Sequence, residues 1–118
     1  IMIGTFVLSS GFQEKYYLRA QKLREAIKED FQEAFKKVDF ILTPTAPTVA
    51  FKVGEKISDP LTMYLQDIYT VPANLAGIPA LSMPIGKVGR LPVGLQIMAD
   101  YFKENQILSL AKTLENFS

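Results

Sequence analysis

Residues 80–99 read ALSMPIGKVGRLPVGLQIMA, and they contain the clearest strand signal in the chain. Two apolar segments, about Ala80 to Ile85 and about Val93 to Ala99, flank the glycine-containing stretch 86–91, which is typical of a hairpin connection. A third apolar segment, residues 38–43, is stopped by the prolines that come after it. All three are nearly continuous apolar runs, the pattern of strands covered on both faces. We therefore expect an α/β fold with helices on both sides of a sheet.

The strongest helical signal lies before these strands. A long amphipathic helix is predicted from about Ser10 to about Lys37, because its apolar residues recur at intervals of three and four and so share one face. Ser10 and Gln13 fit a capping box at its start. The predicted core-facing stripe consists of Tyr16, Ala20, Leu23, Ile27, Phe31 and Ala34.

Two shorter helical segments are indicated further along. Asp59 offers an N-cap with Pro60 at the first helical position, and the buried side of this short helix is predicted to carry Leu61, Leu65 and Ile68. Pro72 should break or kink it, and Gly77 should end the helical segment after that break. A final helix is marked by the apolar stripe Ile107, Leu110, Ala111 and Leu114.

Composition restricts the chemistry more than the fold. The chain has 118 residues, 48% of them hydrophobic, and a formal net charge of +1, so bulk charge indicates neither a nucleic acid nor a membrane partner. Histidine and cysteine are both absent, which excludes a Ser-His-Asp or Cys-His catalytic group and the usual zinc sites. A serine activated by a lysine remains chemically possible, because a desolvated lysine can act as a base.

Residues 1–118 are predicted to form a single, incomplete domain. The predicted helix would be roughly 42 Å long at 1.5 Å per residue, whereas a compact chain of this length should be only about 35 Å across. Three strands covered on both faces also make a poor independent sheet. We expect a larger sheet to continue upstream, because the chain begins inside the apolar stretch Ile1–Phe6.

Four segments carry a family resemblance: residues 1–11, Ile41–Pro47, Asn74–Ala80 and Leu91–Gln96. They resemble, in the same order, the C-terminal portion of the amidase signature enzymes, and the match covers essentially the whole chain. The implied fold is the C-terminal portion of the amidase signature fold, a mixed β-sheet covered by helices on both faces, with the long amphipathic helix. Within that family, the stretch Asp59–Asp67 looks most like the A subunits of glutamyl-tRNA(Gln) or aspartyl-tRNA(Asn) amidotransferases.

The resemblance implies a glutaminase half-reaction in the parent protein. In that family a serine, assisted by a second serine and a lysine, attacks the carboxamide of glutamine. The released ammonia passes to a B subunit, which uses ATP and magnesium to convert Glu-tRNA(Gln) to Gln-tRNA(Gln), and a C subunit braces the other two. The implied partners are therefore the B and C subunits, glutamine, and tRNA through the complex, in the cytoplasm and without a membrane.

The catalytic groups of that family are missing from this chain. Its catalytic serines lie in a Gly/Ser-rich segment that comes after the lysine motif, and neither segment exists here. We therefore assign no catalytic, cofactor-binding or metal-binding residue, and expect these residues alone to be inactive.

One substrate contact is carried over by the resemblance. In the Met-Tyr-Leu-x-Asp stretch of the A subunits, an aspartate helps to recognise the α-amino group of glutamine, and the matching residue here is Asp67. A carboxylate beside an ammonium forms a charge-assisted hydrogen bond. On a helical wheel Asp67 lies off the apolar stripe, which fits a pocket wall or plain solvent exposure equally well.

Other interpretations remain open from the sequence. The parent could be another amidase, acting on arylamides, indoleacetamide or fatty amides, or the chain could be a non-catalytic interaction module derived from one. Thr43 and Thr45 follow a strand end, where functional loops occur, although turn chemistry also explains them. Gln96 could point toward a site or be a satisfied buried amide.

Overall fold

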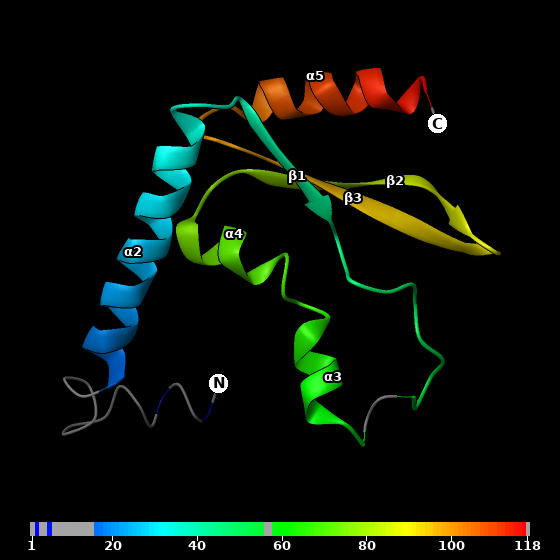
Figure 1. The fold of residues 1–118 in the computed structure, drawn as a ribbon, viewed down its shortest axis with the longest axis horizontal. Helices are drawn as coiled ribbons and strands as arrows, with labels where there is room; N and C mark the ends of the chain where they lie inside the picture. Colours follow the sequence, from blue (N-terminus) through cyan, green and yellow to red (C-terminus); the bar gives the residue numbers. More distant parts are fainter. Residues whose placement is uncertain (1, 3–4, 6–15, 56–57, 118) are drawn as a thin grey trace.

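The computed structural model describes residues 2, 5, 16–55 and 58–117 (Figure 1). Three strands form one antiparallel sheet in the order β1-β3-β2. Figure 1 shows α5 along one side of the sheet and α4 on the other, which confirms the expected α/β class with helices on both sides. The elements are α2 (Leu18–Phe35), β1 (Phe40–Pro44), α3 (Pro60–Leu65), α4 (Val71–Ala76), β2 (Ala80–Val88), β3 (Leu91–Ala99) and α5 (Glu104–Glu115).

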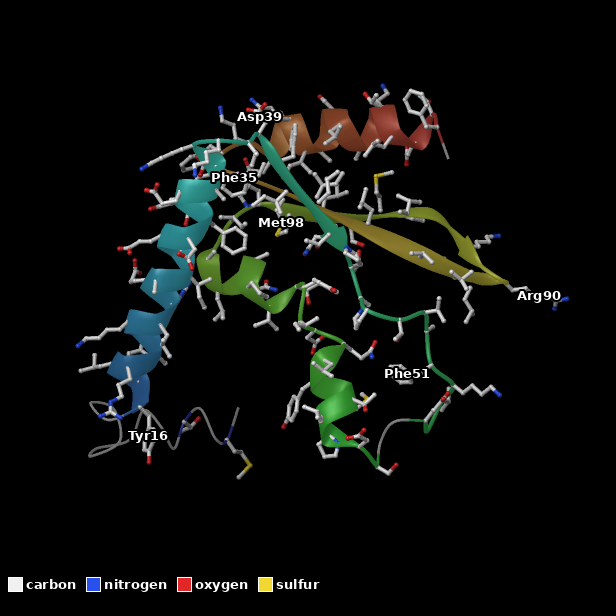
Figure 2. All side chains as sticks on the ribbon, in the orientation of Figure 1. Tyr16, Phe35, Asp39, Phe51, Arg90 and Met98 are labelled. Carbon is white, nitrogen blue, oxygen red and sulfur yellow. The ribbon has the colours of Figure 1, made fainter. Side chains whose placement is uncertain are left out.

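The central strand β3 supplies the core of both faces, because successive side chains of a strand point to opposite sides. Ile97 is fully buried on the face covered by α5, where it packs with Met83, Ala99, Ile107 and Ala111. Met98 points to the other face, toward α4 and the end of α2 (Figure 2). Its cluster contains Ala73, Ala76 and Ile78, with Ile27, Phe31, Phe35, Ile41 and Tyr101 packed against them.

The hairpin between β2 and β3 is tighter than its sequence predicts. The strands run on to Val88 and from Leu91, so only Gly89 and Arg90 connect them, and Arg90 lies at the tip in Figure 2. Gly89 has φ 61°, which fits a type II′ turn, in which the first central residue is glycine. The expected connection of six residues is therefore wrong in length, because the ladder continues through Gly86, Lys87 and Pro92, residue types that are depleted in strands.

The long helix is observed only in part. Helix α2 begins at Leu18 and ends at Phe35, while the predicted start at Ser10 and its capping box lie outside the described residues. The predicted core stripe is correct only at its C-terminal end, where Ile27 and Phe31 pack against the second cluster. Leu23 is 67% exposed, and α2 has no buried residue, because α4 covers only part of the helix.

The short helices α3 and α4 are separate, as predicted, but the break at residues 66–70 lies before Pro72, which is in the first turn of α4. Helix α3 begins at Pro60 after Asp59, whose carboxylate accepts a hydrogen bond from the Thr62 hydroxyl that lowers the pKa of Asp59. Gly77 ends α4 with φ 69° in a Schellman motif, in which the N–H of Ile78 donates to the carbonyl of Ala73.

The apolar side of α3 is not buried, contrary to the prediction. Leu61, Leu65 and Ile68 are 66%, 45% and 51% exposed. Leu61 and Leu65 lie on α3, whereas Ile68 lies in the turn after it, so the predicted stripe is correct only in its first two residues. No described element covers these side chains. The radius of gyration is 17.3 Å, larger than the about 13–14 Å of a compact domain of this length.

Gly94 permits a close approach between β3 and the segment after β1. A Cβ built on Gly94 would lie 2.7 Å from Thr45 Oγ1 and 3.2 Å from Ser82 Oγ. We expect Gly94→Ala to destabilise the intact protein by about 1–3 kcal/mol, the usual cost of overpacking. Urea denaturation measures this, with Gly86→Ala as the matched control, because a Cβ at Gly86 meets nothing within 4 Å. Equal effects of the two substitutions would contradict the steric explanation.

Candidate functional site

Strand register brings three polar residues into one row across the sheet. Gln96 on β3 lies opposite Thr43 on β1 and opposite Ser82 on β2. Directly opposed residues in antiparallel strands point to the same face, and this is the face that α4 covers. Gln96 is the buried member of this row, so its amide requires hydrogen-bond partners.

The amide of Gln96 is buried and satisfied. Its residue exposure is 4%, and Nε2 donates to Thr43 Oγ1 at 3.0 Å and to the main-chain carbonyl of Tyr69 at 2.7 Å. The first bond stays within the sheet, whereas the second crosses to the turn that joins α3 to α4. Of the two interpretations of Gln96, the satisfied buried amide is therefore confirmed.

Thr45 and Ser82 form the next part of this polar surface. Their hydroxyl oxygens lie 2.6 Å apart, directly beside Gly94. The backbone supports this contact, because the N–H of Thr45 donates to the carbonyl of Gly94 at 3.0 Å. The hydroxyls of Thr43 and Thr45 thus both form hydrogen bonds to residues on other strands. Turn formation alone, the simpler explanation of these two threonines, does not account for these bonds.

Asp67 lies in the turn between α3 and α4. Its main chain is held from both sides: the N–H donates to the carbonyl of Tyr64 at 3.2 Å, and the carbonyl accepts from the N–H groups of Thr70 and Val71, both at 3.1 Å. The side chain is exposed, and its carboxylate makes no hydrogen bond or ion pair within the described residues. Hydrogen bonds therefore fix the main chain at Asp67, while its carboxylate is accessible to a ligand or to solvent.

A small cavity of about 260 Å³ lies beside this turn, between α4 and the strands β2 and β3. Its polar lining comes from Thr70, Asn74, Ser82 and Gln96. Thr70 ends the turn that carries Asp67, so the turn and the polar row border the same space. Asp67 itself does not line the cavity. The sequence could not reveal this arrangement, because the contributing residues are spread over 27 positions and three elements.

No catalytic group is assembled among the described residues. The Ser82 hydroxyl is engaged with Thr45, and no hydrogen bond joins a serine hydroxyl to a lysine in the part of the chain that is described. Nor do those residues contain a group of acidic side chains arranged to hold a metal ion. Ser9, Ser10 and Ser118 lie outside the described residues.

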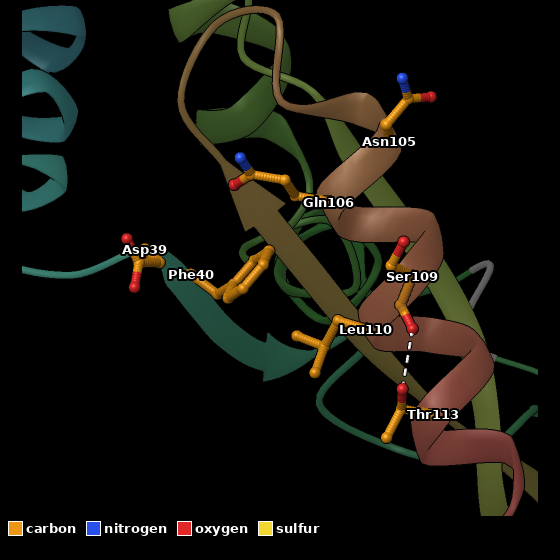
Figure 3. Close-up of a pocket in the computed structure, with 7 residues that line it drawn as sticks. All are labelled: Asp39, Phe40, Asn105, Gln106, Ser109, Leu110 and Thr113. Atoms are coloured by element: carbon orange, nitrogen blue, oxygen red, sulfur yellow. Dashed lines mark hydrogen bonds between the residues drawn. The ribbon is translucent and has the colours of Figure 1, made fainter.

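A second groove lies on the opposite side of the sheet, between the start of β1 and α5 (Figure 3). Asp39 is its only ionisable lining residue, and the Thr113 hydroxyl is already bonded to the carbonyl of Ser109 at 3.0 Å. The groove has other polar lining residues, Asn105, Gln106 and Ser109, but it lies on the face of the sheet opposite the polar row and the turn that carries Asp67. No helix within residues 16–55 and 58–117 has the length and apolar character needed to cross a bilayer.

Comparisons with known proteins match nearly the whole chain to one family. A family model described as Amidase matches residues 1–108. An A subunit of the glutamyl-tRNA(Gln) amidotransferase of Clostridium acetobutylicum is 58% identical over 115 residues, covering 98% of this chain and 24% of the relative. The corresponding A subunit of Pelagibacter ubique is 60% identical over 116 residues, again covering 98% and 24%.

A solved structure gives the same result. The crystal structure of the glutamyl-tRNA(Gln) amidotransferase A subunit from Thermotoga maritima matches with a TM-score of 0.77 and 50% identity, covering 90% of this chain and 23% of that one. The chain therefore spans about a quarter of the length of the curated relatives that it matches.

Proposed function

Because this chain belongs to the amidase family, we propose that it is the C-terminal part of the glutamine-hydrolysing A subunit of a tRNA-dependent amidotransferase. The observation that carries the proposal is the identity of 58% and 60% to two proteins named as that subunit, over 98% of the chain. Because this identity extends over nearly every element, it supports an α3–α4 turn in the same structural environment as in those two proteins. The activity belongs to the complete subunit, of which this chain would be about a quarter.

The proposed reaction is hydrolysis of the side-chain amide of glutamine. A serine hydroxyl attacks the carboxamide carbon, the C–N bond breaks, and the nitrogen leaves as ammonia after taking up a proton. Water then hydrolyses the acyl-enzyme to glutamate. The serines and the lysine base would come from the rest of the subunit, since the described residues assemble no such group.

The proposed contribution of this chain is one side of the glutamine pocket. The Asp67 carboxylate would accept a hydrogen bond from the α-ammonium of glutamine. Its exposed side chain and hydrogen-bonded main chain suit this role, because a charged group that recognises a ligand must be accessible and must be held by a rigid main chain. Such a contact distinguishes glutamine from amides that lack an α-ammonium.

The proposed partners follow from the same subunit identity. We expect a B subunit that uses ATP and magnesium to transfer the ammonia to misacylated Glu-tRNA(Gln), and a C subunit that contacts both, in the cytoplasm. The exposed apolar faces of α2 and α3 suit burial against the rest of the A subunit, since neither helix has a buried residue here.

A substrate comparison on the complete A subunit, purified in its complex, tests the proposed function. We expect release of ammonia from glutamine with a kcat/KM at least about 100-fold above that for a simple amide or an arylamide, because only glutamine engages an ammonium site. The 118-residue chain alone should show no turnover. Faster hydrolysis of arylamides than of glutamine would favour the alternative of another amidase signature hydrolase.

A further inference from the structure

We propose that Gln96 is a positioning residue, which holds the turn that carries Asp67 against the sheet. This inference rests on the proposed role of Asp67 in glutamine recognition. It assigns no contact between Gln96 and the substrate. Gln96 would act through main-chain geometry two residues away from Asp67, by donating from Nε2 to the carbonyl of Tyr69 at 2.7 Å.

The first argument is that the turn has few other attachments to the sheet. Helix α3 has no buried residue, and Leu65 at its end and Ile68 in the turn are about half exposed at 45% and 51%, so little apolar packing holds this segment. The main-chain hydrogen bonds around Asp67 are local, joining residues three or four apart. A longer-range bond beside it, from the Thr48 hydroxyl to Gln66 Oε1 at 3.2 Å, reaches the loop after β1 and not a strand of the sheet. The Gln96–Tyr69 bond joins residues 27 apart and reaches the central strand.

The second argument is the rigidity of the anchor. Gln96 lies on β3, which is paired on both sides, and its exposure is only 4%. Thr43 Oγ1 accepts a second bond from the same amide nitrogen at 3.0 Å, which orients the amide plane. A buried hydrogen bond from such a fixed donor defines the position of the accepting carbonyl, and leaving that carbonyl without a partner would be costly.

The consequence concerns substrate affinity more than the chemical step. A displacement of about 1 Å in a recognition group can cost as much as about 100-fold in catalytic efficiency. Loss of the anchor should loosen the turn and misplace Asp67, while the serines and the lysine, which belong to other segments of the subunit, stay in place. The expected signature is a raised KM for glutamine at a nearly unchanged kcat.

The test uses Gln96→Leu in the complete amidotransferase, with Thr43→Val as the matched control. Leucine removes both hydrogen bonds of the amide at similar volume, whereas Thr43→Val removes only the bond inside the sheet. We expect Gln96→Leu to raise the KM for glutamine about 10-fold, with ammonia-dependent amidation unchanged within about twofold. Thr43→Val should change that KM by less than about threefold.

A measurement that does not depend on activity tests directly whether Gln96 holds the turn in place. Hydrogen–deuterium exchange of the peptide that spans residues 66–71 should increase in Gln96→Leu and increase much less in Thr43→Val, which loses the bond that orients the amide but keeps the bond to Tyr69. Unchanged exchange in Gln96→Leu would overturn the inference, as would equal loss with glutamine and with ammonia, which would indicate general misfolding.

A double variant separates this inference from the proposed function. If Gln96 acts through Asp67, the pair Asp67→Asn and Gln96→Leu should raise the KM for glutamine little beyond Asp67→Asn alone. Multiplicative effects would overturn the positioning role and leave recognition by Asp67 intact. A normal KM in Asp67→Asn would instead overturn recognition by Asp67, and with it the functional consequence of the anchor.

Discussion

Asp67→Asn in the complete amidotransferase is expected to lower the glutamine-dependent kcat/KM by about 10–100-fold, while ammonia-dependent amidation changes by less than about twofold. A hydrogen bond to a charged group is worth about 1.5–3 kcal/mol, and each 1.4 kcal/mol is tenfold. Asparagine keeps the size and an acceptor oxygen but loses the charge that pairs with an ammonium. Ammonia supplied externally bypasses the glutamine pocket, so that reaction has no use for the carboxylate.

The measurement is steady-state kinetics of the same complex with each nitrogen donor. Asp30→Asn serves as the matched control, because Asp30 is another exposed aspartate, on α2. It should leave both activities unchanged. If Asp67→Asn reduced the two reactions equally, Asp67 would be a structural residue, and the glutamine pocket would have to lie elsewhere.

Ile97→Ala is expected to destabilise the protein by about 2–5 kcal/mol, the range for truncating a buried isoleucine. Ile97 is 0% exposed at the centre of the sheet and packs in the cluster beneath α5. Its register partners Leu42 and Leu81 flank it on both sides, so the lost atoms leave a cavity that neighbouring strands cannot easily fill.

Urea denaturation of the complete subunit measures this effect, as a lower midpoint at an unchanged slope. Ile85→Ala is the matched control in the same sheet: Ile85 is 43% exposed and lies at the irregularity between Pro84 and Gly86. It should cost less than about 1.5 kcal/mol. Similar midpoints for the two variants would mean that the cluster under α5 does not form the stable core of this region.

Local sequence signals predicted most element positions. The apolar runs 80–85 and 93–99 became paired strands, Pro60 began α3, and Gly77 ended α4 with a positive φ. Each of these features depends on a residue and its near neighbours: a fixed φ at proline, an αL conformation at glycine, or a run of apolar side chains. Such signals need no knowledge of the rest of the fold.

Burial was less predictable from the same periodicity. Helices α2 and α3 both carry apolar residues of the predicted stripes, yet Leu23 and Leu61 are 67% and 66% exposed. A periodic stripe shows that a helix has an apolar face, but whether that face is buried depends on which element packs against it. In α2 only the part beside α4, around Ile27 and Phe31, is covered.

The amino-acid sequence alone was enough to identify the strands, the family resemblance and Asp67 as a candidate, because these depend on residue types in a fixed order. Only the tertiary structure placed Thr43 beside Gln96, 53 positions away, and Gln96 against the carbonyl of Tyr69. The first contact requires the register of β1 on β3, and the second uses a main-chain atom that every residue possesses. No side-chain pattern marks such an acceptor, so the anchor of the Asp67 turn became visible only once the chain was folded.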